Sequence, residues 1–314
     1  MKTMKWLIKR EMWENKGMLF WTPVVIAGAV AALVLCSLFL GKMGALHIDG
    51  QNIGSVTIEG QARMRIAETL AQVYVAAGTP VLMVLGLLVF FYCLGALHDE
   101  RRDRSLLFWK SLPVSDVKTV MSKLLLAVVV APLITMGIAI ALGLLLLVAT
   151  CIMLLTHGTN MFGAVLAQPD FYLTPLRLIG LLPVYALWAL PTVGWLLMVS
   201  SMARSKVFLW AVGTPVITSL LMLWAEKVLS LGFDTGWFAS HITGRLLLSV
   251  IPGSWLDLNK EQARAMAEQH MSMPEAIFNA SWSSLGSVNL WIGAAAGAAM
   301  IAVAVTMRRR REEV

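Results

Sequence analysis

Residues 124–155 read LLLAVVVAPLITMGIAIALGLLLLVATCIMLL, and no Asp, Glu, Lys or Arg occurs between Lys123 and Asp170. A helix that crosses the hydrocarbon core of a bilayer needs roughly 20 apolar residues. The apolar run is longer than that, so we expect a helix that tilts or projects beyond the bilayer. Residues 156–160 (THGTN) interrupt the run, and too few residues follow for a second crossing. The stretch therefore predicts one long transmembrane helix.

Five further charge-free runs lie on either side of this one. Together the six runs cover residues 17–41, 69–98, 124–169, 178–203, 207–225 and 276–307. Of the 314 residues, 58% are apolar and only 14% are charged, and the mean hydropathy is +0.76. Soluble domains carry about 25% charged residues, so this composition excludes an ordinary cytosolic enzyme. The fold class predicted is all-α: a polytopic membrane protein with six transmembrane helices.

The positions of the basic residues indicate how these helices are oriented. The net charge is +7, and 17 of the 25 Lys and Arg residues precede the first run, follow the sixth, or lie in the loops after the second and fourth. Short loops rich in Lys and Arg stay on the cytoplasmic side. Both termini are therefore expected to be cytoplasmic. The basic residues are expected to contact membrane lipid rather than nucleic acid. The basic, tryptophan-containing residues 1–18 predict an N-terminal amphipathic helix at the inner interface.

No internal repeat or low-complexity linker divides the sequence, so residues 1–314 are predicted to form a single transmembrane domain. Outside the six helices it contains the N-terminal helix of residues 1–18, a cytoplasmic loop of residues 98–120 and an outer segment of residues 226–285. We expect a multi-pass protein of the cell inner membrane.

Three features bear on how the helices pack. Only residues 204–206 separate the fourth and fifth runs, which predicts an antiparallel hairpin of these two helices. Gly293 and Gly297 have the GxxxG spacing that lets a second helix approach closely, either within the chain or in a dimer. Prolines inside the helices permit kinks, which suit either a path lined by helices or static packing. These prolines are Pro80, Pro132, Pro183, Pro191 and Pro215.

The sequence lacks the motifs of bond-making chemistry. Its five histidines are scattered without HExxH or a paired Cys/His set, and neither GxSxG nor the phosphate loop GxxxxGK[ST] occurs. No pair of acids lies mid-membrane, where an ion-coupled carrier would keep them. We therefore predict no catalytic residue, no metal and no cofactor in this chain. Driven transport would take its energy from another polypeptide or from an ion gradient.

The loop after the second run combines charges with an apolar block. Charged residues at 99–104 can pair along one helical turn, apolar residues follow at 106–109, and Pro113 ends this helix. Two interpretations fit. The loop is a docking site for a cytoplasmic partner, or it is an ordinary positive-inside loop whose aromatic residues anchor in the headgroups.

In this loop the chain resembles the permease subunit of type 2 ABC exporters. In that family a glutamate after the second span, a leucine pair, a Leu-Pro-Val-Ser segment and a lysine that opens the third span form a recurring signature. The matching residues are Glu100, Leu106, Leu107, Leu112, Pro113, Val114, Ser115 and Lys123. Residues 9–16 are similar to the family's amphipathic helix before the first span. One departure is Arg104-Ser105, where many members have Gly-Thr.

The resemblance implies a homodimer or heterodimer of six-span permease subunits joined to two copies of a separate ATP-binding subunit. That partner would bind ATP, push on the inner loop and the N-terminal helix, and so drive cargo outward. The residues implied in coupling to the ATP-binding subunit are Glu11, Trp13, Glu100, Arg101, Arg104, Leu106, Leu107, Trp109 and Pro113. The alternatives are a gradient-driven secondary transporter or channel, and a membrane-embedded enzyme or scaffold protein.

Overall fold

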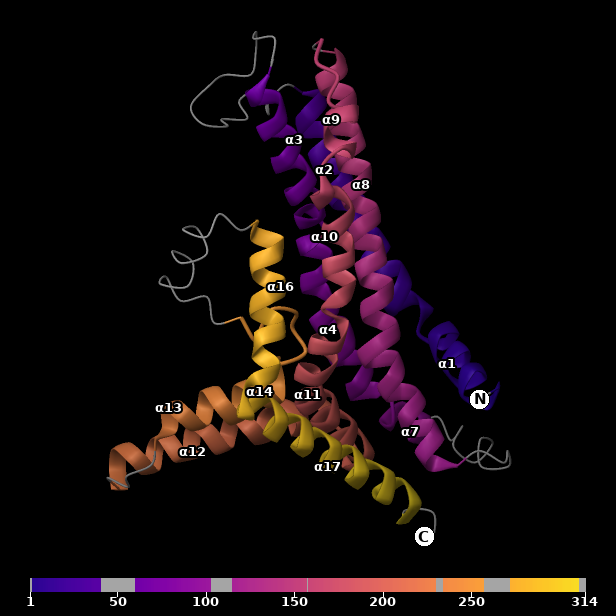
Figure 1. Ribbon diagram of the computed structural model, residues 1–314. Coiled ribbons are helices and arrows are strands. Elements are labelled where there is room, and N and C mark those ends of the chain that lie inside the picture. The colour runs from indigo at the N-terminus through magenta and orange to yellow at the C-terminus, as the bar shows by residue number, and fades with distance from the viewer. Residues whose placement is uncertain are drawn as a thin grey trace.

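The computed structural model describes residues 2–40, 60–102, 115–156, 158–229, 234–256 and 272–310. Within these ranges all regular secondary structure is helical, and no strand occurs (Figure 1). Six helical segments are long and apolar enough to cross a membrane: Gly17–Leu38, Gln61–Glu100, Asp116–Thr156, Pro169–Met202, Leu209–Leu229 and Val288–Arg309. Each overlaps one of the six charge-free runs, so the prediction of an all-α protein with six candidate spans is confirmed.

The first part of the chain supplies three of these segments. Its elements are α1 (Lys2–Glu14), η1 (Gly17–Trp21), α2 (Thr22–Phe39), α3 (Gln61–Val73), η2 (Tyr74–Gly78), α4 (Thr79–Gly95), α5 (His98–Arg102), α7 (Asp116–Leu125), η3 (Leu126–Val130) and α8 (Ala131–Thr156). Helices α2, α4 and α8 pack on one another, and η2 lies against α8. The beginning of the described chain and α7 lie toward the same side of the molecule as its C-terminal end (Figure 1).

The second part supplies the other three segments. Its elements are α9 (Phe162–Leu166), α10 (Pro169–Gly180), α11 (Leu182–Met202), η4 (Leu209–Gly213), α12 (Thr214–Leu229), α13 (Thr235–Phe238), η5 (Ala239–Thr243), α14 (Gly244–Leu248), α16 (Met273–Ser283), η6 (Ser284–Gly286) and α17 (Val288–Arg310). Helix α11 packs along α17 and also contacts α4. The segment that contains α11 is the most buried of the six, whereas the first and fifth are the least buried.

The third segment is as long as its sequence predicts. Elements α7, η3 and α8 follow one another without a break, and the 41 residues from Asp116 to Thr156 span roughly 60 Å at 1.5 Å per residue. That is about twice the ~30 Å hydrocarbon core of a bilayer. The far part of α8 packs with α3 and α9 around a separate apolar core that includes Tyr74, Leu147 and Met161. The molecule therefore extends well beyond one bilayer thickness at this end.

Local changes of helix type precede several prolines. Proline lacks the N–H that an α-helix uses, and its ring clashes with the preceding turn. Pro132 follows the π-helical turn η3, Pro215 follows the π-helical turn η4, and Pro80 follows the 3-10 turn η2. Because a wider or tighter turn changes where the carbonyl groups point, these turns accommodate the proline rings. Pro191, by contrast, lies inside the α-helix α11.

The GxxxG glycine Gly297 is used for packing inside the chain. A Cβ atom added to Gly194 of α11 would lie 2.5 Å from the carbonyl oxygen of Gly297, and one added to Gly297 would lie 2.6 Å from the carbonyl group of Leu190. No real side-chain atom fits in that space, so α11 and α17 cross backbone against backbone at these glycines. Of the two roles considered for the spacing, the intrachain one is the role that Gly297 fills.

The expected hairpin of the fourth and fifth helices is present only beside the connection between them. Element η4 contacts α11, but α12 then leaves the bundle and packs with α13 and η5 (Figure 1). Both helices are apolar all around, so their sequences do not specify which side meets a neighbour. In a bilayer, lipid tails cover an apolar helix as well as another helix does. The short connection therefore does not force the two helices together.

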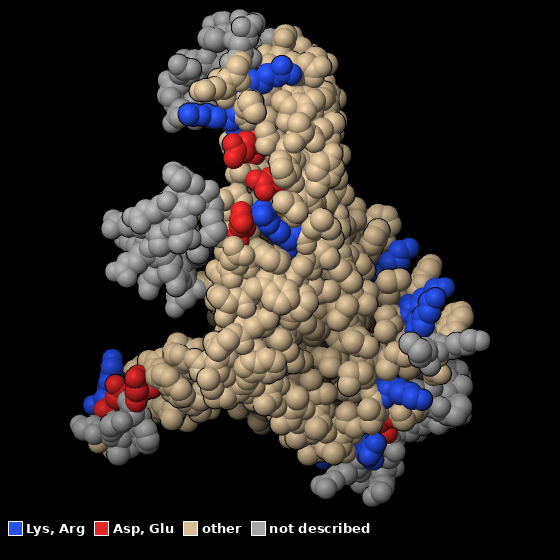
Figure 2. Space-filling model, in the orientation of Figure 1, with Lys and Arg blue, Asp and Glu red and all other residues tan. Residues whose placement is uncertain are grey.

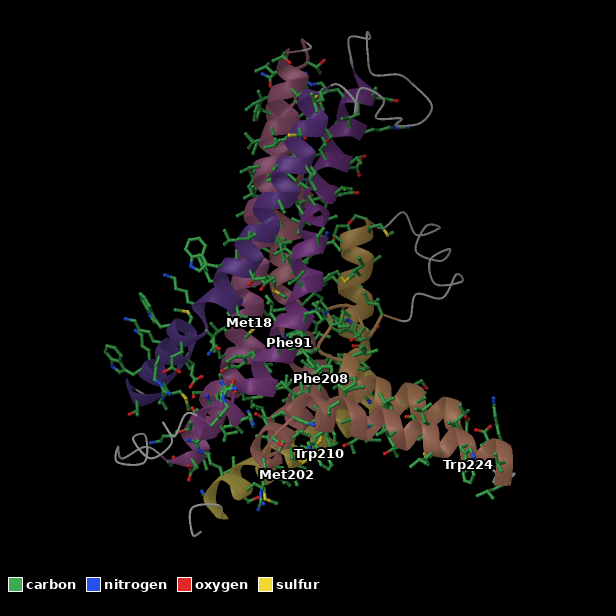
Figure 3. All side chains as sticks on the ribbon, turned by 180° about the vertical axis from the view of Figure 1, so that it is seen from behind. Met18, Phe91, Met202, Phe208, Trp210 and Trp224 are labelled. Atoms are coloured by element: carbon green, nitrogen blue, oxygen red, sulfur yellow. The ribbon has the colours of Figure 1, made fainter. Side chains whose placement is uncertain are left out.

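Large apolar side chains cover much of the outer surface. Phe91, Trp210 and Trp224 lie on it (Figure 3), and each is more than half exposed. On the face that Figure 2 shows, Lys, Arg, Asp and Glu lie along the upper arm, at the far end of α12 and along the lower right edge, and a broad surface without charge lies between these groups. Exposed apolar surface of this extent is unfavourable in water. This distribution supports a multi-pass membrane protein.

Candidate functional site

Charged side chains from four helices meet at the end of the molecule where the described chain begins and ends. They come from α1, α5, α7 and α17, and three are acidic and three basic. We call them the ionic cluster, which consists of Arg10, Glu11, Glu100, Asp116, Lys123 and Arg308. Because the formal charges cancel, the cluster as a whole places no net charge inside the protein.

Lys123 is the centre of the cluster. Its Nζ atom lies 2.9 Å from both carboxylate oxygens of Glu11 and 2.9 Å from Oε1 of Glu100. Lys123 and Glu11 are each only 2% exposed. Burial of an ion costs several kcal/mol, which close pairing and hydrogen bonds must offset. Two hydrogen bonds to Glu11 and a close ion pair with Glu100 offset that cost for Lys123, and they join α1 and α5 to α7.

Arg308 extends the cluster to the last helix. Its Nη1 atom donates to Oε2 of Glu100 at 2.8 Å, and its Nε atom donates to Oδ1 of Asp116 at 2.9 Å. The Tyr92 hydroxyl of α4 donates to Oε2 of Glu11 at 3.3 Å. The two glutamates therefore connect five helices: Glu11 links α1 to α4 and α7, and Glu100 links α5 to α7 and α17.

The junction between α4 and α5 is also held from α11. The Ser200 hydroxyl oxygen accepts hydrogen bonds from the backbone N–H groups of Leu97 at 3.1 Å and His98 at 3.0 Å. Ser200 is fully buried. These bonds satisfy two backbone donors at the start of α5, where a helix has no carbonyl partners of its own. They fix the position from which Glu100 enters the cluster.

Helix α1 has two different faces. Glu11 and Leu7 are buried, whereas Trp6 and Trp13 are 67% and 61% exposed. Two residues along an α-helix correspond to a rotation of about 200°, so Glu11 and Trp13 point in nearly opposite directions. The Lys16 ammonium lies 5.2 Å from the Trp13 ring, a cation–π contact on the outer face. The structure thus places Trp13 away from the cluster that holds Glu11.

The other residues predicted for coupling are distributed as follows. Glu11 and Glu100 are brought together around Lys123, and Arg101 lies on the short helix α5. The remaining ones lie outside the described residues, in the stretch 103–114: Arg104, Leu106, Leu107, Trp109 and Pro113.

Sequence reasoning on the coupling site missed Arg10, Asp116 and Arg308, and it named Lys123 only as part of the family signature. The signal for Lys123 and Arg308 was present, because each is the charged residue that borders an apolar run. Glu11 lies four residues after Leu7, on the apolar side of a mainly basic helix. An acid in that position is a candidate for a buried partner.

The arrangement links the ends of α5, α7 and α17 mechanically. Any displacement of α5 must either carry α7 and α17 with it or break contacts of 2.8–2.9 Å in a buried site. In the part of the chain that the structure describes, no group of three or more His, Cys, Asp or Glu residues is placed to hold a metal ion. No protein-family model, curated protein or solved structure matches this chain.

Proposed function

We propose that this chain is the transmembrane permease subunit of an ATP-driven ABC exporter, which moves a substrate outward across the cell inner membrane and is driven by a separate ATP-binding subunit. One observation carries the proposal. Glu100 and Lys123, two residues through which the sequence resembles type 2 exporter permeases, contact each other, and Lys123 also contacts Glu11 of the N-terminal helix.

The proposed orientation places this end of the molecule in the cytoplasm. The segments that meet at the ionic cluster flank the basic N-terminus, the basic loop after the second span and the arginines at the C-terminus. Regions rich in Lys and Arg stay on the cytoplasmic side of a membrane. In this orientation α1 lies at the inner interface, with its exposed tryptophans among the headgroups.

The proposed mechanism is a transfer of force through the cluster. When the partner binds ATP, it presses on α5 and the loop of residues 103–114. Glu100 moves with α5 and, through Lys123 and Arg308, shifts the inner ends of α7 and α17. Because α17 packs along α11, a shift of α17 reaches the centre of the bundle. The permease dimer would then open outward; the ATP chemistry belongs to the partner.

A gradient-driven carrier is the main rival, because buried acids and bases also serve ion-coupled transport. The position of the cluster favours the exporter. Its acidic members lie on α1, on α5 after the second span and on the first residue of α7, so they are at helix ends rather than along the middle of a span. A carrier would require ionisable groups on the path itself.

The test compares two glutamate substitutions in the chain co-purified with its ATP-binding partner. Glu100→Gln removes the charge that links Lys123 and Arg308. Glu14→Gln removes a half-exposed charge whose only ion-pair partner among the described residues is Arg10. We expect Glu100→Gln to remain in the membrane and bind the partner, but to lose most of its stimulation of ATP hydrolysis. Glu14→Gln is expected to behave as wild type.

A second variant, Leu107→Asp, probes the apolar block of the loop in the same assay. Loss of coupling in both variants supports the proposal. Wild-type stimulation of ATP hydrolysis by both variants would contradict the proposal. Solute uptake driven by an ion gradient, in liposomes that contain this chain alone, would favour the carrier.

A further inference from the structure

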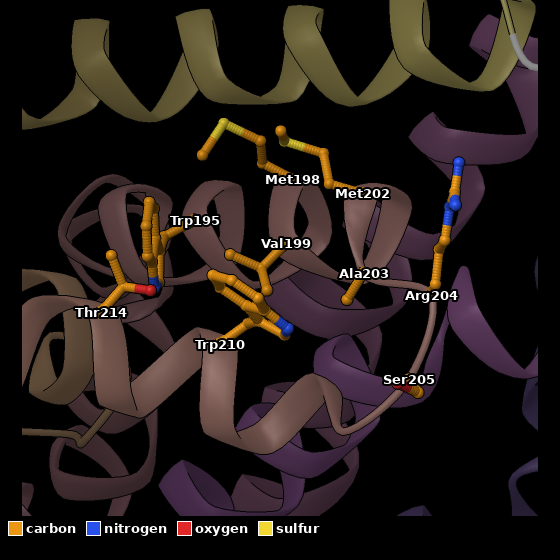
Figure 4. Close-up of a pocket in the computed structure, with 9 residues that line it drawn as sticks. All are labelled: Trp195, Met198, Val199, Met202, Ala203, Arg204, Ser205, Trp210 and Thr214. Carbon is orange, nitrogen blue, oxygen red and sulfur yellow. The ribbon is translucent and has the colours of Figure 1, made fainter.

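A cavity of about 570 Å³ lies between α11 and the start of the fifth span (Figure 4). Trp195 and Met198 of α11 and Trp210 of η4 form its apolar part. Arg204 and Ser205, in the connection between the two helices, lie at one end of it (Figure 4). Volumes of roughly 300–1,000 Å³ are typical of sites for small organic ligands. The cavity therefore combines an apolar body with a cationic end.

The cavity exists because α12 diverges from α11 at this point. The indole Nε1 of Trp195 donates to the carbonyl oxygen of Ala211 at 2.9 Å, which attaches the first turn of the fifth span to α11. Beyond that attachment α12 turns away. Trp210 is 60% exposed and Met202 is 41% exposed, so the apolar wall faces the surroundings of the protein. The Trp195 bond holds this wall in place before any ligand enters.

Arg204 differs from the two arginines of the ionic cluster. Arg10 and Arg308 are paired with carboxylates in the ionic cluster. Arg204 is exposed, and among the described residues it has neither an ion pair nor a hydrogen bond. The residues that line the cavity include no Asp or Glu. A guanidinium group in this setting has its full set of donors available to an anion from outside the chain.

The cationic end lies at the level of the membrane interface. Arg204 follows α11, and Ser200 on the last turn of α11 bonds to the start of α5 after the second span. That level is where phospholipid headgroups are found when the six segments cross a bilayer. A phosphodiester at this position can accept two parallel hydrogen bonds from Arg204 and one from the Ser205 hydroxyl. Its acyl chain would extend along Trp195, Met198 and Trp210.

We propose that this cavity binds an acidic phospholipid, with the phosphate at Arg204 and Ser205 and an acyl chain against the two tryptophans. A second copy of the chain is a poorer occupant, because its corresponding end is also basic and would bring further cations to Arg204. The inference requires only that the protein resides in a membrane. It does not depend on an ATP-binding partner.

The experiment uses the full chain in phosphatidylcholine nanodiscs that contain brominated phosphatidylglycerol or, in a parallel series, brominated phosphatidylcholine. Bromine on the acyl chain quenches tryptophan fluorescence at contact distance. Subtraction of the quenching seen in Trp210→Phe isolates the contribution of the cavity. We expect half-maximal quenching of Trp210 at a mole fraction of brominated phosphatidylglycerol about fivefold lower than that of brominated phosphatidylcholine. This is the factor expected for one basic side chain at an anionic surface.

Arg204→Gln is expected to abolish the fivefold preference, and Arg204→Lys to keep part of it. Arg309→Gln is the matched control, because Arg309 is an exposed arginine of the same end that does not line the cavity. It should leave the preference unchanged. Arg204 is exposed, so neither of its substitutions should disturb the fold.

Three results would overturn the proposal. Equal quenching by the two lipids, or an unchanged preference in Arg204→Gln, would show that the cavity does not select an acidic headgroup. No quenching of Trp210 by either lipid would mean that protein, such as a second copy, covers the cavity. Displacement of brominated phosphatidylglycerol by inorganic phosphate alone would identify the site as one for the free anion.

Discussion

Replacement of Lys123 by methionine is expected to destabilise the protein strongly, although the two side chains are similar in length. Lys123 is 2% exposed and is within 2.9 Å of both Glu11 and Glu100. Without it, Glu100 keeps Arg308 at 2.8 Å. Among the residues that the structure describes, the Glu11 carboxylate keeps only Arg10, at 3.9 Å, and the Tyr92 hydroxyl. A buried carboxylate would thus lose its principal partner.

The size of the loss in unfolding free energy distinguishes a buried ionic cluster from an exposed one. Removal of one member of a buried ion pair costs about 3–5 kcal/mol, whereas an exposed pair contributes about 0–1 kcal/mol. Lys123→Met should therefore lower the free energy of unfolding by about 3–5 kcal/mol. Glu14→Gln, which breaks the half-exposed pair with Arg10, should lower it by less than about 0.5 kcal/mol.

The assay is reversible denaturant unfolding of the purified chain in detergent micelles, followed by its helical circular dichroism. A double variant, Glu11→Met with Lys123→Met, completes the comparison. Because apolar replacement of both partners leaves no uncompensated charge between them, the double variant should be more stable than Lys123→Met alone. A loss below about 1 kcal/mol in Lys123→Met, or strictly additive losses in the double variant, would refute the buried pairing.

Three further predictions concern packing and hydrogen bonds, and each is checked by the same unfolding measurement. Gly297→Ala should lower the free energy of unfolding by about 1–3 kcal/mol, because the added Cβ would meet the Leu190 carbonyl. Gly137→Ala is the control: the space at its Cβ is open, so the free energy of unfolding should stay unchanged or rise by up to about 1 kcal/mol. Ser200→Ala should cost about 1–3 kcal/mol, since it removes the acceptor of two backbone N–H groups at the start of α5. Trp13→Ala should change stability by less than about 0.5 kcal/mol, because that side chain is 61% exposed; a loss as large as that of Lys123→Met would contradict the orientation of α1.

The six candidate spans could be predicted from the sequence because charge-free runs of sufficient length are a direct consequence of bilayer thickness. The ends of the third segment also match signals in the sequence. It begins beside Ser115 and ends at Thr156, where the apolar run is interrupted. The arrangement of the helices was less predictable. Helices α11 and α12 are apolar on all sides, so no stripe in either sequence marks the face that meets a neighbour, and the divergence of α12 could not be inferred.

The ionic cluster was predictable in part. Glu11, Glu100 and Lys123 were named through the resemblance to exporter permeases: Glu11 in the N-terminal helix, and Glu100 and Lys123 in the loop signature. Their contact depends on the packing of α1 against α7, which brings together residues more than 100 positions apart. No local pattern encodes that packing. Arg308 was interpreted only as a marker of orientation, because its partner Glu100 lies 208 positions earlier in the chain.

The proposed function makes this chain a gate that a separate ATP-binding subunit moves through the ionic cluster. The most direct test is ATP hydrolysis and solute transport by the purified chain in proteoliposomes, measured with and without the proposed ATP-binding subunit. We predict that the chain alone hydrolyses no ATP and moves no solute uphill, and that both activities appear when the partner is added. Hydrolysis of ATP, or uphill transport on an ion gradient, by the chain alone would contradict the account.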